Sequence, residues 1–442
     1  VVHLDNGLPL GQLLAVAARP AGGKALALDT ALPTPSGWTT MGEVAVGELV
    51  LGADGHPAMV TRATDVMTGR PCFEVEFCDG SVIVADAEHQ WLTETRSSRT
   101  SFQSARDGRN RTRSQRTFAE VRTTSEIAAT LRCDTAEKRL NHSVPLAAPL
   151  DLFEQSYLIP PYVLGAWLGD GTTASAQITS ADPGIVMRLE SEGLSVTRQS
   201  STLRYSLRWP EEEAVRRQCV VCGVEFVPQT SQVKTCGRSC GGKAKAVSAK
   251  SMAPSCPDCG APSSGLRRCE ICNAKHGSVQ GALRTVGVLN NKHIPADYLR
   301  GSERQRRELL AGLLDTDGTV TSSGCPQFTT TSDRLHRGVY ELIVSLGYRC
   351  GVSRKRVLGH TEQSLTAFTL TFSSDDDVFG LERKRLLHKD LRGRAFQRRN
   401  SRFITAVRPV ESVPVRCIEV DSQAHLYLAG ESMIPTHNST WG

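Results

Sequence analysis

The sequence lacks the two features that would direct a chain into a membrane. No run of about 18 apolar residues is present. The first residues also lack the charged, apolar and small-residue order of a signal peptide. We therefore expect a soluble, cytoplasmic protein with no membrane partner. Its 442 residues exceed what one hydrophobic core usually supports, which predicts two or three domains.

A strong charge of one sign is missing as well, since the net charge is only +6. The basic residues are nevertheless unevenly placed, with one run from Arg383 to Arg402 and an earlier run with Asp107 as its single acid. The earlier run contains seven arginines: Arg96, Arg99, Arg106, Arg109, Arg111, Arg113 and Arg116. Two interpretations stay open, polyanion binding through counterion release and an ordinary solvated loop.

The cysteines are not spread as in a small disulfide-bonded domain. Eight of the 14 lie within residues 219–272 in spaced pairs: Cys219, Cys222, Cys236, Cys240, Cys256, Cys259, Cys269 and Cys272. Short loops that carry two thiolates each suit tetrahedral zinc, and four sulfur ligands leave no open position for catalysis. The pattern predicts two structural Zn²⁺ sites, with disulfides as the less favoured alternative in a reducing cytosol.

The two ends of the chain complement each other. Residues 1–24 end in AARPAGGK and the last four residues are STWG, so joining Lys24 to Ser439 would give ARPAGGKST. In such a loop backbone amides cradle phosphates, the lysine reaches the terminal ones and the serine hydroxyl holds magnesium. The joined segment resembles the nucleotide-binding loop of DnaB-type replicative helicases, over the 28 flanking residues only. Lys24 and Ser439 would therefore bind ATP and Mg²⁺ only after they are joined.

The segments just inside these flanks, ALALDT and IPTHN, resemble the ends of inteins, which splice themselves out of a host protein. Inteins usually begin with Cys or Ser, whereas Ala25 cannot attack a carbonyl. Cys417 in VRCIEV stands where the family ordinarily has Asp, and a thiolate is a strong nucleophile. Together with Trp91 and Thr436, it matches the Trp-Cys-Thr inteins, which dispense with an N-terminal nucleophile. Asp86 stands where the family often has Thr.

This resemblance implies autocatalytic splicing without a cofactor, which excises residues 25–438 and joins Lys24 to Ser439. Cys417 would form a thioester with Lys24, Ser439 would take the acyl group as an ester, and Asn438 would cyclise to release the intein. His89 is the candidate general acid because an imidazole can hold a proton near neutral pH. His437 and His425 are candidates to assist cleavage after Asn438. Thr436 is a candidate to position the loop. Taken singly, Cys417, Trp91 and His89 each have a structural interpretation, as a small buried residue, a core aromatic and a structural histidine.

Two apolar segments inside the insertion, PYVLGAWLGDG (161–171) and ELLAGLLDTDGTV (308–320), resemble the two LAGLIDADG motifs of homing endonucleases. The resemblance implies helices packed through Gly165 and Gly312, with Asp170 and Asp317 binding Mg²⁺ to cleave both strands of a DNA target site. The alternative for either helix is core packing with a glycine C-cap. KHIP (292–295) lies between the two copies, as is frequent in this family.

The predicted fold is multi-domain: an all-β splicing domain of the Hedgehog/intein (HINT) type, interrupted by an α+β LAGLIDADG endonuclease that carries a zinc-ribbon-like insertion. The predicted segments are the helicase flanks 1–24 and 439–442, the splicing parts 25–125 and 403–438, the endonuclease halves 126–218 and 273–402, and the Cys-rich insertion 219–272. Two other functions stay open. One is a splicing-inactive DNA-binding or nuclease protein, and the other is a helicase fragment with ATPase activity, which the separation of Lys24 from Ser439 argues against.

Overall fold

The structure is a computed structural model that describes residues 24–106, 118–199, 203–210, 217–226, 235–237, 240, 277–357, 365–392 and 401–438. These residues fall into two compact units. The first consists of the residues up to Gln155 together with those from Ala296 onward, and the second spans Ser156–Pro295.

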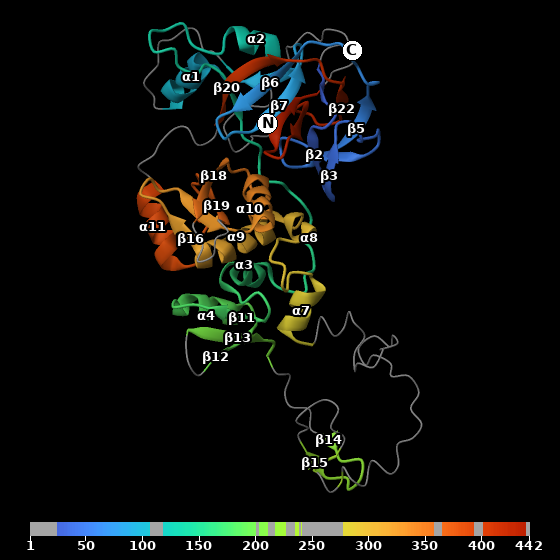
Figure 1. Cartoon of the computed structure of the whole chain (residues 1–442), viewed down its shortest axis with the longest axis vertical. Helices are drawn as coiled ribbons and strands as arrows, with labels where there is room; N and C mark the ends of the chain where they lie inside the picture. Colours follow the sequence, from blue (N-terminus) through green and yellow to red (C-terminus); the bar gives the residue numbers. More distant parts are fainter. Residues whose placement is uncertain are drawn as a thin grey trace. The chain divides into compact units, whose positions relative to one another are not determined.

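The first unit is built around an antiparallel sheet with the strand order β10-β20-β6-β7-β1-β21. Its strands are β1 (Leu26–Ala27), β6 (Cys72–Phe77), β7 (Val82–Asp86), β10 (Ser143–Pro145), β20 (Ser401–Val410) and β21 (Val415–Arg416). β20 pairs with β6 and β10, and β21 pairs with β1, so strands from the two ends of the chain lie side by side (Figure 1). The predicted pairing across the insertion is therefore present. β10 adds residues beyond the first splicing segment predicted at 25–125.

The hairpin of β6 and β7 shows why these residues form strands. Val, Ile and Phe side chains favour the pleated, half-buried surface of a sheet. The turn that follows β6 contains Gly80 at φ +85°, a conformation that glycine adopts without steric cost. The Asp79 carboxylate accepts a hydrogen bond from the backbone N–H of Ser81 at 3.1 Å and fixes the turn.

Smaller sheets complete the β part of this unit, in the orders β22-β5-β4, β2-β3, β23-β24 and β8-β9. Their strands are β2 (Ala31–Thr34), β3 (Gly37–Thr40), β4 (Leu49–Leu51), β5 (Pro57–Ala63), β8 (Gln90–Thr93), β9 (Glu120–Thr123), β22 (Ile418–Val420), β23 (Leu426–Ala429) and β24 (Ile434–His437). Side chains from both ends of the chain share one buried core, including Leu26, Val75, Trp91, Ile404, Ile418 and Tyr427. Two helices accompany these sheets, α1 (Arg96–Arg106) and α2 (Thr124–Ala129), and α2 begins with a capping box at Thr123 and Glu126.

The rest of the first unit is an α+β region. Its sheet has the order β16-β17-β19-β18, with β16 (Gly318–Val320), β17 (Pro326–Thr330), β18 (Cys350–Val357) and β19 (Leu365–Phe372). The helices are α8 (Ala296–Leu299), α9 (Glu303–Asp317), α10 (Asp333–Ser345) and α11 (Glu382–Arg392). α9 begins with a capping box formed by Ser302 and Gln305. The α10 helix packs on this sheet through buried residues that include Leu335, Val339 and Leu342.

The second unit contains α3 (Pro161–Asp170), α4 (Pro183–Ser191) and α7 (Val279–Thr285). A sheet of order β11-β13-β12 accompanies them, with β11 (Gln177–Thr179), β12 (Ser195–Arg198) and β13 (Arg204–Arg208). A separate hairpin joins β14 (Arg217–Gln218) and β15 (Glu225–Phe226). Throughout the described ranges, every helix is too short or too polar to cross a lipid bilayer.

Candidate functional site

The predicted N-terminal junction is buried at the start of β1. Ala25 lies in one buried cluster with Cys72, Val415 and Cys417. Its carbonyl accepts a hydrogen bond from the backbone N–H of Asp86 at 3.0 Å, and Leu26 already pairs with Arg416 and Ala85. Sheet pairing therefore brings the predicted nucleophile Cys417 close to the bond between Lys24 and Ala25.

The backbone of Cys417 is fixed between β21 and β22. Its N–H donates to the Thr64 hydroxyl at 3.1 Å, and its carbonyl accepts from the Thr64 N–H at 3.0 Å. The thiol is 4% exposed and its sulfur lies 3.9 Å from the Ile418 carbonyl oxygen. A buried thiol alone suits a core residue, so the distinguishing observation is its place beside Ala25.

The predicted C-terminal junction is held by backbone groups. Asn438 is fully buried at the end of the β23–β24 hairpin. Its N–H donates to the His425 carbonyl at 2.8 Å, and its side-chain Nδ2 donates to the Val420 carbonyl at 2.9 Å. His425 itself has a φ of +53°, in the left-handed region. The amide nitrogen that would attack during cyclisation is therefore oriented by a carbonyl of β22.

The two predicted junctions meet at the Asn438 carbonyl oxygen. Lys24 Nζ donates to this oxygen at 3.3 Å, and His437 Nδ1 lies 2.7 Å from it. Burial lowers the pKa of Lys24, whereas the nearby Cys417 and Glu419 raise it. Burial also lowers the pKa of His437 to about 4, so its imidazole is neutral near pH 7 and donates from Nδ1 as the corresponding tautomer.

A second contact between the ends joins His89 to the C-terminal hairpin. His89 Nε2 is hydrogen-bonded to the Thr436 hydroxyl, and the Trp91 ring contacts the imidazole edge-on with centroids 4.8 Å apart. Trp91 Nε1 donates to the Thr124 hydroxyl at 3.0 Å. Burial lowers the pKa of His89 to about 3, an effect that the Lys24 backbone partly opposes. The imidazole is therefore neutral near pH 7 in the resting structure, and its role as general acid stays a prediction.

Asp86 forms a buried ion pair with Arg70 and a backbone contact with Ala25, neither of which the sequence indicates. Its carboxylate is fully buried and pairs with Arg70 Nε at 2.6 Å. Burial raises the pKa of Asp86 to about 6, against the opposing effect of Arg70. Because the Asp86 N–H also binds the Ala25 carbonyl, this pair supports the N-terminal junction. Arg70 carries no motif that could have identified it from sequence.

The first LAGLIDADG-like segment forms α3 in the second unit. The helix is buried from Tyr162 to Leu168, including Gly165, and ends at Asp170. A Cβ at Gly171 would lie 2.2 Å from the Trp167 carbonyl oxygen, so only glycine fits after this helix. Lys292 of the KHIP segment donates to the Gly169 carbonyl at 2.8 Å, which gives this lysine a structural role at the helix end.

The second LAGLIDADG-like segment forms α9 in the first unit, with Gly312 buried and Asp317 as its last residue. A Cβ at Gly318 would approach the Leu314 carbonyl oxygen to 2.4 Å. Asp315 is buried and accepts hydrogen bonds from the N–H groups of Gly380 and Leu381, both at 3.0 Å. Both predicted helices are therefore present and end at the predicted aspartates, each within its own unit. The roles of Asp170 and Asp317 stay predictions.

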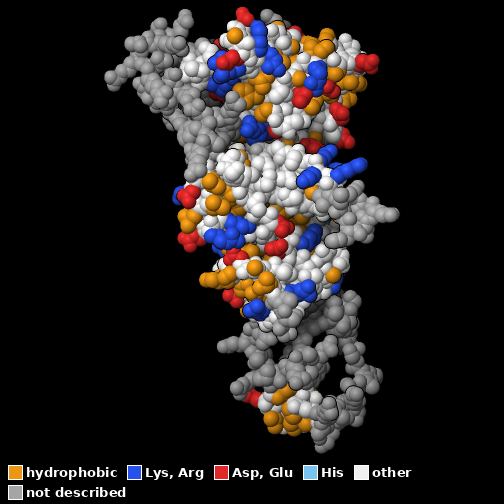
Figure 2. All heavy atoms as spheres, turned by 60° about the vertical axis from the view of Figure 1, so that its left-hand side comes forward, with side chains coloured by type: hydrophobic (Ala, Val, Ile, Leu, Met, Phe, Trp, Pro, Cys, Tyr) orange, Lys and Arg blue, Asp and Glu red, His pale blue; other side chains and the backbone are white. Residues whose placement is uncertain are grey.

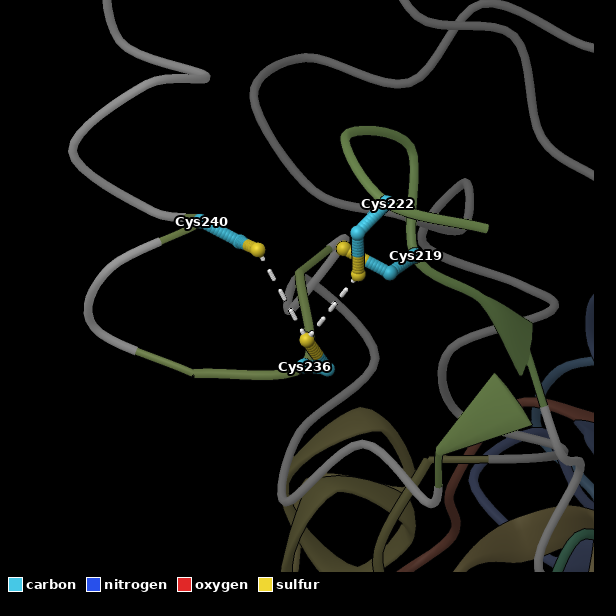
Figure 3. Close-up of side chains that lie close together, drawn as sticks. All are labelled: Cys219, Cys222, Cys236 and Cys240. Carbon is cyan, nitrogen blue, oxygen red and sulfur yellow. Dashed lines mark hydrogen bonds between the residues drawn. The ribbon is translucent and has the colours of Figure 1, made fainter. Parts of the chain in front are cut away.

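Four of the eight predicted zinc ligands lie together in the second unit (Figure 3). The four sulfur atoms, from Cys219, Cys222, Cys236 and Cys240, lie within 4.8 Å of one another. The sulfurs of Cys222 and Cys236 are 3.5 Å apart. Tetrahedral zinc with bonds of about 2.3 Å places its sulfur ligands about 3.8 Å apart, so the cluster has the dimensions of a four-thiolate site. The other four predicted ligands, Cys256, Cys259, Cys269 and Cys272, lie outside the described residues, as does Ser439.

Basic residues share the surface with acidic ones. On the face drawn in Figure 2, basic and acidic side chains are interspersed over the described residues. Arg99 donates to the carbonyls of Glu94 and Asn141, at 2.7 and 3.0 Å, which gives it a structural role. Together with Arg96, Arg139 and Arg349 it lines a cavity of about 1020 Å³ in the first unit. The predicted arginines from Arg109 to Arg116 lie outside the described residues.

No protein-family model matches the chain. The chain is 54% identical over 428 residues to a replicative DNA helicase DnaB of Mycobacterium intracellulare, a match that covers 97% of this chain and 60% of the helicase. The chain thus spans less than two thirds of that relative's length. A segment similar to nearly the whole chain, insertion included, is therefore present in a DnaB-type helicase.

Two solved structures align with most of the chain. The crystal structure of the MchDnaB-1 intein is 21% identical, and that of the Msm DnaB1 intein splicing domain bound with zinc is 20% identical. Each alignment covers 94% of this chain and 100% of the solved chain, with a TM-score of 0.26.

Proposed function

We propose that residues 25–438 are an intein in a DnaB-type helicase, which excises itself and joins Lys24 to Ser439. The observation that carries this proposal is the meeting of the two junctions, with Lys24 Nζ 3.3 Å from the Asn438 carbonyl oxygen. The similarity to a DnaB helicase over 97% of the chain supports the host assignment. The helicase flanks are then partners in cis, and joining them would complete the ATP and Mg²⁺ loop of Lys24 and Ser439.

In the first step the Cys417 thiolate attacks the Lys24 carbonyl carbon. A carbon–sulfur bond forms, the bond between Lys24 and Ala25 breaks, and the Ala25 nitrogen takes up a proton. The proton that Cys417 loses passes to this nitrogen, with His89 proposed as the group that carries it and acts as the general acid. Proximity favours the attack, since Ala25 and Cys417 share one buried cluster.

In the later steps the acyl group moves to the Ser439 hydroxyl, and Asn438 Nδ2 attacks its own backbone carbonyl carbon. Succinimide formation breaks the bond between Asn438 and Ser439. The freed Ser439 amine then captures the ester, giving a normal peptide bond. The Val420 carbonyl orients Nδ2, and the hydrogen bond from the Asn438 N–H to His425 holds the residue during cyclisation. Thr436 positions His89 through its hydroxyl.

Intact-mass measurements on freshly expressed chain test splicing directly. The parent is expected to yield a 414-residue excised segment and a 28-residue ligated peptide. Cys417→Ala should abolish the ligated peptide. Asn438→Ala should keep the acyl group on Cys417 or Ser439 and lose cleavage after residue 438. A parent chain that stays intact would contradict the proposal and would leave a splicing-inactive DNA-binding or nuclease protein.

We also propose that the insertion is a LAGLIDADG endonuclease that cleaves double-stranded DNA. Its support is the motif similarity together with the two buried helices that end at Asp170 and Asp317. Each carboxylate would hold Mg²⁺ against a scissile phosphate. Cleavage of a randomised duplex library with Mg²⁺ should be lost in Asp317→Asn, whereas no enrichment of cut sequences with the parent protein would contradict this activity.

The cysteine cluster is proposed to bind one structural zinc ion. Its support is the set of four sulfurs within 4.8 Å, because four thiolates suit tetrahedral zinc and leave no coordination position for a reaction. A second such site is proposed for the four cysteines from Cys256 to Cys272. Metal analysis of the purified chain should find two equivalents of zinc, and zinc-free folded protein would contradict both sites.

A further inference from the structure

The last residue before the N-terminal junction contacts the reacting group of the C-terminal junction. Lys24 is 9% exposed, and its Nζ donates to the Asn438 carbonyl oxygen at 3.3 Å. His437 Nδ1 approaches the same oxygen at 2.7 Å. This oxygen belongs to the carbonyl carbon that Asn438 Nδ2 would attack, so two nitrogen donors converge where negative charge would develop.

We propose that Lys24 is a catalytic residue for C-terminal cleavage, in which its ammonium group stabilises the oxyanion formed at Asn438. This role rests on the proposed splicing function and adds to it. The sequence alone identifies Lys24 only as the residue before the junction and as a phosphate ligand of the loop that forms after joining. Here a residue of the host protein supplies part of the catalytic site that removes the insertion.

The step balances within the chain. Attack by Asn438 Nδ2 forms a carbon–nitrogen bond and moves the carbonyl electrons onto the oxygen that faces Lys24 and His437. Collapse of this intermediate restores the carbonyl and breaks the bond between Asn438 and Ser439. Nδ2 loses one proton and the departing Ser439 nitrogen gains one, so no external reactant is needed.

Burial lowers the pKa of Lys24, and the nearby Cys417 and Glu419 oppose part of this shift. The neighbouring imidazoles of His89 and His437 have lowered pKa values, so they add no competing positive charge near pH 7. A contact of 3.3 Å is long for a neutral carbonyl, and it strengthens as the oxygen becomes negative in a buried, water-poor site.

Cleavage after Asn438 would then depend on the N-terminal flank that carries Lys24. The Lys24 carbonyl passes from Cys417 to Ser439 during splicing, and its side chain travels with it, so the ammonium stays near the junction until the final step. Hydrolytic loss of the N-terminal segment would remove this donor together with the segment. C-terminal cleavage is therefore fastest while the ligation partner is still attached.

The test uses the full chain with Cys417→Ala, which removes the first step and isolates cleavage after Asn438. In this background we compare Lys24→Met, which keeps the length of the side chain, with Lys24→Arg, which keeps the charge. Intact mass against time gives the cleavage rate. Loss of one oxyanion donor is expected to slow cleavage by about tenfold to a hundredfold in Lys24→Met, since His437 still donates, and Lys24→Arg should recover most of the rate.

Lys292→Met is the matched control, because it also removes a lysine that donates to a backbone carbonyl, at 2.8 Å, but in the second unit. It should cleave at the parental rate. Equal rates for Lys24→Met and its parent would overturn the role of Lys24 and leave splicing intact. Equal slowing in Lys24→Met and Lys24→Arg would also overturn it, by assigning the loss to shape rather than charge. The unmodified chain is followed beside these variants, and only an unmodified chain that stays intact would reject the proposed function.

Discussion

The two predicted junctions differ in how the groups proposed to react are held. At the C-terminal junction, the Asn438 N–H, Nδ2 and carbonyl oxygen each have a hydrogen-bond partner. At the N-terminal junction the backbone of Cys417 is fixed by Thr64, whereas its sulfur has a weak contact of 3.9 Å with the Ile418 carbonyl. Asn438 is therefore held through three of its polar groups, and the backbone of Cys417 is held across the sheet by Thr64.

This difference follows from the chemistry that each end would perform. Cyclisation of Asn438 is intramolecular, so it gains most from fixed geometry and from donors at the developing oxyanion. Attack by Cys417 needs an ionised thiol and a proton for the departing amine, so it depends on proton transfer in a buried pocket. The N-terminal reaction should be the more sensitive to changes in proton donors and acceptors.

The largest expected difference between the junctions comes from His89→Ala. Loss of a proton-transfer group should slow N-terminal thioester formation by about 100- to 10,000-fold, with a much smaller effect on C-terminal cleavage. Hydroxylamine-induced release of the N-terminal flank in an Asn438→Ala background measures the first step. Thr436→Val, which removes only the hydroxyl bonded to His89, is the milder control. Equal slowing at both junctions would show that His89 acts on the fold rather than on one reaction.

Arg402→Met should loosen the C-terminal junction instead. The Arg402 guanidinium pairs with buried Asp79 at 2.5 Å and donates to the Ser432 carbonyl at 3.1 Å, in the turn of the β23–β24 hairpin. Removing one partner of a buried ion pair costs about 3–5 kcal/mol of unfolding free energy. Urea unfolding measures this loss, and C-terminal cleavage should slow with it.

Tyr340→Phe is the matched variant at the same turn, because the Tyr340 hydroxyl is 2.5 Å from the Ser432 hydroxyl. The loss of one such hydrogen bond should cost about 1 kcal/mol. If Arg402→Met costs no more than Tyr340→Phe, the ion pair does not anchor the hairpin.

Acid should destabilise both junctions together. Burial lowers the pKa values of His89 to about 3 and of His437 and His142 to about 4, from an ordinary value of 6.5. At these histidines the unfolded chain therefore binds more protons, and their contribution to stability falls as the pH drops from about 6.5 towards 4, by up to about 1.4 kcal/mol per pH unit for each histidine. Asp86, whose pKa burial raises to about 6, takes up a proton in the folded state over the same range and offsets part of this loss. Urea unfolding at pH 7 and pH 5 measures this loss. His142→Gln should reduce it, and equal stability at the two pH values would contradict the buried neutral state.

Zinc removal should leave both junctions nearly unchanged, because the cysteine cluster belongs to the second unit. Cys222→Ser is expected to lose one equivalent of zinc and to splice at the parental rate, with Cys325→Ser as a control outside the cluster. Metal content and splicing rate are measured on the same samples. A splicing rate that falls in step with zinc content would show that the second unit controls the reaction.

The features of the site that depend on the type of side chain at each position were predictable from the sequence. The pairing of the two ends, the position of Cys417 beside Ala25, and the helices ending at Asp170 and Asp317 all follow from residue patterns. The arginine run beginning at Arg96, by contrast, was open to a loop interpretation but forms helix α1 over Arg96–Arg106.

Other features could not be predicted because they depend on backbone groups or burial. Val420 orients Asn438 through its carbonyl, and Thr64 fixes Cys417 by contacts across the sheet. Every residue has a backbone carbonyl, so the sequence does not indicate that the Val420 carbonyl binds Asn438. The neutral state of His89 reflects complete burial, a property that only the folded environment determines.

The contact between Lys24 and Asn438 also suggests how a host protein could tolerate the proposed segment 25–438. A folded element whose two ends lie side by side can enter another chain at a single point without forcing the host residues apart. Here the ends approach to 3.3 Å through one side chain and one carbonyl. The segment proposed to be excised could therefore interrupt even a tight loop and leave the flanking residues close enough to be rejoined.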